Sequence, residues 1–145
     1  MKRVINEMKL RLPAKSENES VARSIISAFC ASLDPVLEEL CDLRCAVSEA
    51  VTNCIVHAYP ESEGAGKHYI YITAKLYENR EICVEVTDKG CGIENVALAQ
   101  EKSYTTGGAE RSGMGFLVME SFCDAVRVRS AVGAGTSVTL VKKLK

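Results

Sequence analysis

The chain has 145 residues, a formal net charge of −1, and 47% hydrophobic against 26% charged residues. This is the composition of one folded domain, and it argues against disorder and against non-specific nucleic-acid binding. No apolar run approaches the length of a membrane span, and the N-terminal residues lack the apolar region of a signal peptide. We therefore expect a single cytoplasmic domain that binds neither nucleic acid directly nor a membrane.

Seven cysteines are scattered through apolar segments. Without a secretory signal, we expect most of them to be reduced thiols that pack as small hydrophobic side chains. Cys41 and Cys45 stand four residues apart on a predicted helix and could share a metal ion. No second Cys/His pair completes a tetrahedral set, so we favour a structural role for both.

The chain begins with a predicted strand followed by a helix. Apolar and charged residues alternate over 8–12, which predicts a strand that ends near Pro13. Ser16 and Glu19 have the spacing of a capping box, which predicts the start of a helix. One apolar stripe then runs along this helix, formed by Val21, Ala22, Ile25, Ile26, Phe29 and Leu33.

A second helix is predicted directly after the first. Asp34 would serve as its N-cap and Pro35 as its first helical residue, because proline needs no hydrogen-bond acceptor there. The apolar periodicity continues to about residue 58, and a polar, glycine-containing loop follows over 59–67. The stripe on this helix comprises Leu40, Val47, Ala50, Val51, Cys54 and Ala58.

Two strands come next, joined by a turn at 78–80. Their inward faces follow a period of two and comprise Ile70, Ile72, Ala74 and Leu76, then Ile82, Val84 and Val86. The same period places Asp88 on the inward face. A carboxylate on the core side of a strand is costly unless something pairs with it, so Asp88 is a candidate functional residue.

The C-terminal third predicts one more helix and a hairpin. Residues 94–112 lack sustained periodicity and are expected to form a mobile segment. A helix is predicted over 115–122, and alternating residues over 126–142 predict a closing hairpin around its glycines. Helices on one face of a mainly antiparallel sheet make an α+β, two-layer sandwich.

The first chemical motif is Glu49 with Asn53. Four residues apart on a helix, these side chains share one face beside the apolar stripe. An amide oxygen suits Mg²⁺, which accepts few protein ligands when phosphates supply the others, and a nearby carboxylate could take a proton from an attacking hydroxyl. Standing alone, the pair could equally be a solvated polar rim of the helix.

The second motif is Asp88 with Gly90 and Gly92. An inward carboxylate at a strand end can accept a hydrogen bond from an exocyclic amine such as adenine N6, which selects adenine over guanine. Glycines there allow a base and sugar to approach the backbone closely. Standing alone, this motif could equally be an ordinary turn.

The third motif is Gly113 with Gly115, which opens the helix over 115–122. Amide donors at a helix N-terminus bind phosphate, and Arg111 just before them could contact a terminal phosphate. A flexible glycine loop is the alternative for this motif alone. Order and spacing of the three motifs together predict an ATP site that uses no Walker loop.

The three motifs, over 48–53, 88–92 and 110–116, resemble the N, G1 and G2 boxes of the GHKL ATPase/kinase superfamily. Gly135 and Thr136 resemble its tail box. Together with 18–23 and the turn at 33–35, these segments are most similar to the bacterial anti-sigma factor serine kinases, and among them to the sporulation members. The resemblance covers nearly the whole chain.

The resemblance implies a Bergerat ATP-binding fold over 1–145, with 94–112 as the ATP lid, and a homodimer that uses ATP/ADP and Mg²⁺. It implies Glu49 as catalytic base, Asn53 as Mg²⁺ ligand, Asp88 as the adenine contact and Arg111 near the γ-phosphate. Arg23 falls where this branch meets its protein partners. Further nucleotide contacts are implied for Gly90, Gly92, Thr105, Thr106, Ser112, Gly113, Met114, Gly115 and Thr136.

The function implied is that of an anti-sigma factor that holds a sporulation sigma factor and phosphorylates a serine of its anti-anti-sigma antagonist. Two alternatives remain. One is a kinase of another branch, such as an anti-sigma kinase for a general-stress sigma factor. The other is a module that binds ATP and a sigma factor without transferring phosphate; Glu49 disfavours it, because a pure binder needs no base there.

Overall fold

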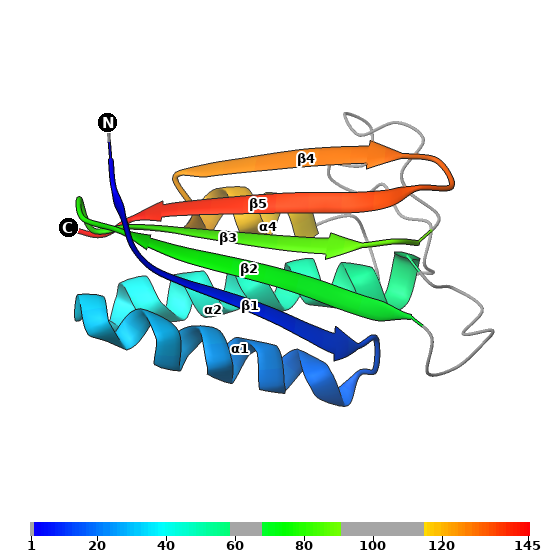
Figure 1. Ribbon diagram of the computed structural model, residues 1–145, viewed down its shortest axis with the longest axis horizontal. Coiled ribbons are helices and arrows are strands. Elements are labelled where there is room, and N and C mark those ends of the chain that lie inside the picture. The colour runs from blue at the N-terminus through cyan, green and yellow to red at the C-terminus, as the bar shows by residue number, and fades with distance from the viewer. Residues whose placement is uncertain (1, 59–67, 91–114) are drawn as a thin grey trace.

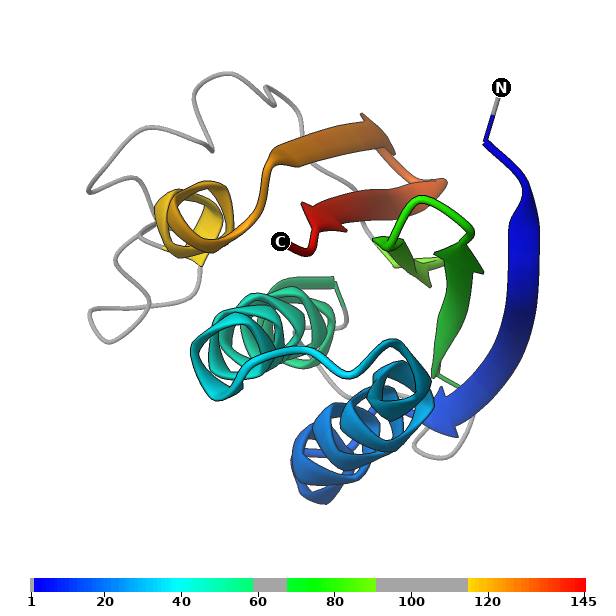
Figure 2. The same cartoon turned by 90° about the vertical axis from the view of Figure 1, so that its left-hand side faces the viewer.

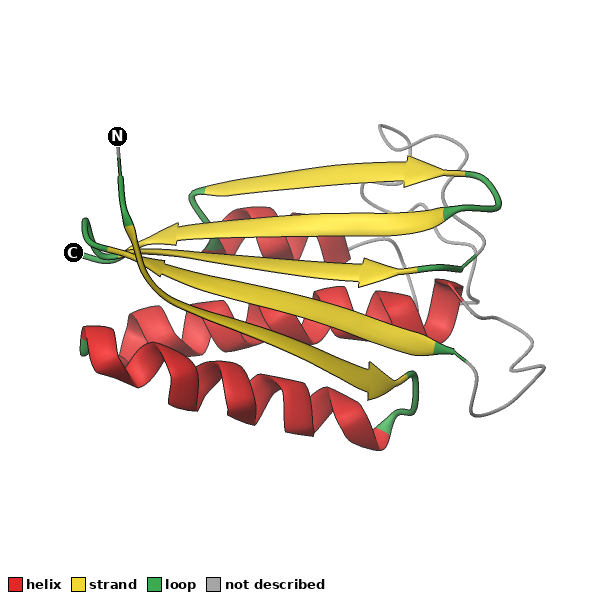
Figure 3. Ribbon diagram, in the orientation of Figure 1, coloured by secondary structure: helices red, strands yellow, loops and turns green. Residues whose placement is uncertain are grey.

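The computed structural model describes residues 2–58, 68–90 and 115–145. These residues form a five-stranded antiparallel sheet, with strand order β1-β2-β3-β5-β4, and helices on one face of it (Figures 1 and 3). This confirms the predicted α+β sandwich. The elements are β1 (Val4–Pro13), α1 (Glu17–Cys30), a 3₁₀ turn (Ala31–Leu33), α2 (Leu37–Asn53), a π-helical turn (Cys54–Ala58), β2 (Tyr69–Tyr77), β3 (Glu81–Asp88), α4 (Gly115–Phe122), β4 (Ala125–Ala131) and β5 (Gly135–Lys143).

The inward faces of β2 and β3 are those that the alternation predicts. The buried positions are Ile70, Ile72, Ala74 and Leu76 on β2, and Ile82, Val84, Val86 and Asp88 on β3. The two strands pair antiparallel, with Ile70 opposite Asp88. The turn between them places Arg80 at φ 66°, which lets the chain reverse within three residues.

Helices α1, α2 and α4 lie together on one side of the curved sheet, as the end-on view shows (Figure 2). Between the two layers lies one apolar core. Helix α1 contributes Ala22, Ile26 and Cys30 to it, and α2 contributes Leu43, Ala46, Val47, Ala50 and Val51. Helix α2 therefore has a buried side and contacts both α1 and α4, while Cys41 and Cys45 lie on its exposed side.

The predicted capping box at Ser16 is wrong. Ser16 already has a helical backbone (φ −57°, ψ −34°), and its side chain makes no capping hydrogen bond. The N–H of Glu19 bonds to the Ser16 carbonyl instead. The Glu19 carboxylate accepts a hydrogen bond from Ser48 on α2, so a tertiary contact replaces the local one.

The predicted start of the second helix at Asp34 and Pro35 is also wrong. Asp34 has a left-handed backbone (φ 52°), which an N-cap residue does not adopt. Val36 is extended and caps α2, and the Val36 N–H donates to Glu39 Oε1 at 3.1 Å. Glu39 Oε2 accepts the N–H of Lys145 at 2.8 Å, so the start of α2 is tied to the C-terminal residue.

Among the described residues, no helix combines the length and the apolar character needed to cross a membrane. The cysteines of that part of the chain are all free: Cys30 and Cys54 are buried, Cys83 and Cys123 are half-buried, and Cys41 and Cys45 are exposed. Burial raises the pKa of the Cys30 thiol to about 12, which favours the inert, protonated form expected of a packed side chain.

Candidate functional site

Glu49 and Asn53 lie on the last turn of α2, where the backbone hydrogen bonding changes. The α-helical pattern ends at Asn53, and the five residues Cys54–Ala58 continue as a π-helical turn. The sequence predicts one continuous helix to about residue 58, and the helical course is as expected, although its hydrogen bonding is not. Single π-helical turns occur frequently at functional sites.

Helix α4 begins against these two side chains. A Cβ atom on Gly115 would lie 3.1 Å from Glu49 Oε1 and 3.5 Å from both Oδ1 and Nδ2 of Asn53. A side chain at this position would require the Glu49 carboxylate to shift by a few tenths of an ångström, and glycine avoids that shift. The fold thus brings together a carboxylate, an amide and the N-terminal backbone of a helix.

Asp88 forms a second polar cluster at the end of β3. Its side chain is 5% exposed, and Asp88 Oδ1 accepts the N–H of Gly90 at 2.9 Å and the N–H of Thr136 at 3.2 Å. Burial raises the pKa of Asp88 above its ordinary value, while hydrogen bonds from Gly90, the Cys54 thiol and Thr136 oppose this rise. Because both backbone donors use Oδ1, the carboxylate keeps acceptor capacity at Oδ2.

The start of β5 packs tightly on the backbone of Asp88. Gly135 has φ +105°, and a Cβ atom there would lie 2.2 Å from the Asp88 carbonyl oxygen and 2.8 Å from Lys89 Cα. No residue with a side chain fits this position. The approach places the Thr136 N–H on the Asp88 carboxylate, and Thr136 Oγ1 lies 2.7 Å from Ser130 Oγ.

Cys54 joins the two clusters, and sequence reasoning missed it. It follows Asn53 directly, is 3% exposed, and its thiol contacts the Asp88 carboxylate. The periodicity assigns Cys54 to the apolar stripe, where it also packs. One signal that could have revealed the contact is the inward position of Asp88, since a buried carboxylate requires donors from the helix layer.

Arg23 lies apart from both clusters, on α1, where it pairs with Glu19 at 3.5 Å. Several predicted site residues fall outside the described residues, as does the predicted lid over 94–112; these residues are Gly92, Thr105, Thr106, Arg111, Ser112, Gly113 and Met114. In the part of the chain that the structure describes, no three His, Cys, Asp or Glu side chains are arranged to hold a metal ion.

The two clusters fit the two ends of an adenine nucleotide. Asp88 offers a buried acceptor for an exocyclic amine, and Asn53 offers an amide oxygen for a hard cation that phosphates also bind. The N-terminal backbone of α4, next to Asn53, suits a phosphate. The groups that an adenine nucleotide needs at its base and at its phosphates are therefore present in these two clusters.

Comparison with known sequences identifies the class of protein. Residues 12–142 match the histidine kinase-like ATPase domain family. The chain is 48% identical over 139 residues to the anti-sigma F factor of Clostridium acetobutylicum, covering 95% of this chain and 94% of the relative. It is 47% identical over 142 residues to that of Pasteuria penetrans, covering 97% and 92%. The chain belongs to the histidine kinase-like ATPase family and, within it, to the anti-sigma F factors.

Solved structures show the same fold in more distant proteins. The RsbU and RsbW domains of a Mycobacterium tuberculosis protein superpose with a TM-score of 0.69 at 19% identity, covering 96% of this chain but only 32% of that longer one. The SiaB–SiaC complex of Pseudomonas aeruginosa gives 0.63 at 14% identity, covering 96% and 89%. The fold is that of kinase-like ATPases, and ATP or ADP is the nucleotide that such a domain binds.

Proposed function

We propose that this protein is an ATP-dependent protein-serine kinase and anti-sigma factor. It holds a sporulation sigma factor and phosphorylates a serine of the anti-anti-sigma protein that would displace it. The name of its relatives supports the sigma-factor role. The observation that carries the kinase role is the placement of Glu49 beside Asn53 and the start of α4.

Glu49 acts as the base in this proposal. ATP supplies the phosphoryl group, and a bound Mg²⁺ ion would neutralise charge that develops during transfer. Asn53 would hold this ion through its side-chain oxygen. Glu49, one helical turn earlier, accepts the proton of the attacking serine hydroxyl, and the backbone N–H groups at the start of α4 orient the phosphates.

Asp88 selects the base at the other end of the site. Its carboxylate is fixed through Oδ1 by the N–H groups of Gly90 and Thr136, so Oδ2 is oriented to accept the adenine amine. Gly92, Thr105, Thr106, Ser112, Gly113 and Met114 complete the nucleotide contacts in this proposal. Arg111, in the proposed lid over 94–112, is the proposed contact near the γ-phosphate.

Arg23 is the partner contact in this proposal. Its guanidinium is half-exposed on α1 and carries the charge that suits an acidic segment of a sigma factor or an anti-anti-sigma protein. The working unit is a cytoplasmic homodimer, each chain being a single domain over 1–145.

The test uses purified protein, Mg²⁺, γ-labelled ATP and the anti-anti-sigma protein of the same genome. Wild-type protein should label a serine of that acceptor. Glu49→Ala should bind ATP within a few-fold of wild type yet transfer label roughly 10²–10⁴-fold more slowly, which is the usual contribution of a general base. Glu38→Ala is the matched control, because Glu38 is an exposed glutamate on the first turn of the same helix.

Each outcome decides between the alternatives. Wild-type transfer rates in Glu49→Ala would remove Glu49 as the base. ATP binding without any transfer by the wild-type protein would favour a binding module. Label on the antagonist of a general-stress sigma factor, and none on the sporulation antagonist, would move the protein to the stress branch.

A further inference from the structure

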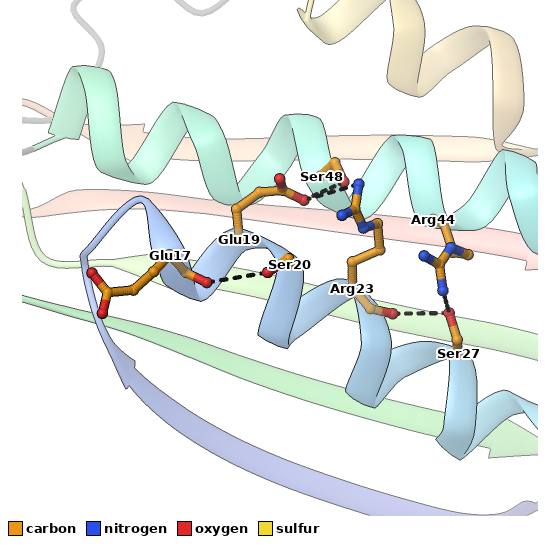
Figure 4. A network of polar contacts seen from close by, with 7 residues as sticks. All are labelled: Glu17, Glu19, Ser20, Arg23, Ser27, Arg44 and Ser48. Carbon is orange, nitrogen blue, oxygen red and sulfur yellow. Dashed lines mark hydrogen bonds and ion pairs between the residues drawn. The ribbon is translucent and has the colours of Figure 1, made fainter.

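A hydrogen bond joins helices α1 and α2 one residue before the proposed base. Ser48 Oγ donates to Glu19 Oε2 at 2.7 Å, and both side chains are half-buried (Figure 4). A hydroxyl that donates to a carboxylate forms a charge-assisted bond, which is stronger than one between neutral groups. The direct sequence neighbour of Ser48 is Glu49, so this bond acts on the part of α2 that carries the base.

The same carboxylate oxygen also meets Arg23. Glu19 Oε2 lies 3.5 Å from Arg23 Nη1, and the two side chains are 26% and 34% exposed. Figure 4 shows Ser48 and Arg23 converging on this oxygen. The Nε of Arg23 is buried without a hydrogen-bond partner, so this guanidinium has donor capacity that its contact with Glu19 does not use.

Helix α2 is in contact with a neighbouring helix on each side at Ser48 and Glu49. On the α1 side the contact is Ser48 with Glu19, and on the α4 side Gly115 lies against Glu49. A side chain ends roughly 5–6 Å from its helix axis, so a rotation of α2 by about 10° moves the end of Glu49 by about 1 Å. A displacement of about 1 Å can cost roughly 10²-fold in rate.

We propose that Glu19 and Ser48 are a positioning pair for Glu49: their bond fixes the rotation of α2 and so the place of the base. Neither residue is among the proposed nucleotide contacts. This role rests on the proposed kinase function. Because Arg23 shares Glu19 Oε2, the pair also links the partner-facing surface of α1 to the helix that carries the base.

A second hydrogen bond between α1 and α2 provides a control for the test of the Glu19–Ser48 bond. Arg44 Nη1 donates to Ser27 Oγ, also at 2.7 Å, one helical turn before Ser48 on α2 (Figure 4). Ser27 Oγ in turn donates to the Arg23 carbonyl at 2.9 Å. Removing the Ser27 hydroxyl deletes an interhelical bond of the same length without touching the turn that carries Glu49.

The experiment measures phosphotransfer at saturating acceptor, the dissociation constant of ADP, and thermal stability. Ser48→Ala should lower kcat at least fivefold, while the ADP dissociation constant stays within twofold of the wild-type value. Ser27→Ala should lower the melting temperature by a similar amount yet leave kcat within twofold. If loss of stability alone lowered kcat, both variants would show the same decrease. If Ser48 positions Glu49, only Ser48→Ala should show it.

Two changes at Glu19 separate its partners. Glu19→Ala removes the acceptor and should lower kcat as Ser48→Ala does, and the double variant should show little further loss because both changes break one contact. Glu19→Gln keeps a side-chain oxygen for Ser48 while removing the charge that pairs with Arg23. It should recover most of the lost kcat and change KM for the acceptor instead.

The failures of the two proposals differ. If wild-type protein transfers label and Ser48→Ala has the same kcat, or Ser27→Ala falls equally, the positioning role is wrong and the kinase function stands. Losses in Glu19→Ala and Ser48→Ala that multiply in the double variant would also refute the pair. A wild-type protein that transfers no label would overturn the kinase proposal and this role with it.

Discussion

Replacing Asp88 by asparagine separates nucleotide recognition from folding. Asparagine has nearly the same shape, and its oxygen can still accept the N–H groups of Gly90 and Thr136 that now meet Asp88 Oδ1. The other end of the side chain changes from a carboxylate oxygen to an NH₂ group. That group would face the exocyclic amine of adenine, donor against donor.

The loss of affinity follows from these contacts. A hydrogen bond to a charged group contributes about 1.5–3 kcal/mol, and a buried donor left unsatisfied costs about 1–3 kcal/mol. With partial relaxation of the side chain, Asp88→Asn should weaken ADP binding by about 2–4 kcal/mol, roughly 30- to 1,000-fold in the dissociation constant. Isothermal titration calorimetry with ADP and Mg²⁺ measures this loss directly.

The same substitution, Asp88→Asn, should leave the free energy of unfolding unchanged or raise it, although it lowers ADP affinity. Burial raises the pKa of Asp88, so the folded chain holds this proton more tightly than the unfolded chain. The resulting stabilisation is present below the ordinary pKa of 3.8 and is lost as pH rises through the folded pKa. At neutral pH the ionised carboxylate is therefore a cost that asparagine lacks, and Asp88→Asn should unfold in urea at the same concentration as wild type or a higher one.

The control is Glu85→Gln, which removes a carboxylate from an exposed position of the same strand. It should change neither ADP affinity nor stability appreciably. Unchanged ADP affinity in Asp88→Asn would refute the adenine contact. Lost affinity accompanied by a large loss of stability would instead show that the charge of Asp88 holds the fold together, contrary to the argument from burial.

Two glycines give further predictions. Gly115→Ala places a methyl group 3.1 Å from Glu49 Oε1 and should displace this flexible carboxylate. Phosphotransfer should then slow at least tenfold, while the free energy of unfolding changes by no more than about 1 kcal/mol. An unchanged rate of phosphotransfer would contradict the assigned contact. Gly135→Ala combines a positive φ with overlap on the Asp88 carbonyl and should cost at least about 3 kcal/mol in urea unfolding. Gly133→Ala is its control: φ is also positive, but nothing lies within 4 Å, so about 1 kcal/mol is expected, and equal losses would refute the overlap argument.

The sheet could be predicted because its pattern is local and unambiguous. Strands β2 and β3 alternate strictly, and one buried face follows from a period of two. The same rule places Asp88 on the inward face, and the structure confirms that position. A polar residue that breaks an apolar face was thus the most informative signal for this end of the site.

The helix starts could not be predicted in the same way. Capping rules describe a competition among local hydrogen bonds. At α1 the expected capping carboxylate bonds to a distant residue, and at α2 a local bond from Val36 to Glu39 forms at a residue type that the rules disfavour as an N-cap. Glu19 serves Ser48 on another helix rather than its own N-terminus, and Glu39 serves both Val36 and the C-terminal Lys145. Such contacts span 29 and 106 residues, and no local pattern contains them.

In the candidate site, too, some features could be predicted from the local sequence and others could not. Spacing alone put Glu49 and Asn53 on one helical face, but it could not show that the first residue of α4 lies against them. Likewise, Cys54 is one of several apolar positions in the helical stripe, and its contact with Asp88 depends on how the end of β3 packs against the helix layer. Local periodicity predicts which side of an element a residue occupies, whereas the partner on that side depends on how the layers pack.

The end of α2, together with Cys54 directly after it, makes more tertiary contacts than any single sequence motif indicates. Going along the chain, Ser48 is held by α1, Glu49 lies against α4, and Cys54 contacts the carboxylate at the end of β3. Seven consecutive residues therefore meet three different elements, and they do so where the α-helix gives way to a π-helical turn. A helix segment fixed in this way can hold the groups proposed to bind the adenine and the phosphates at a constant distance from each other. Both sets of groups contact the same short piece of backbone, so they cannot easily move apart.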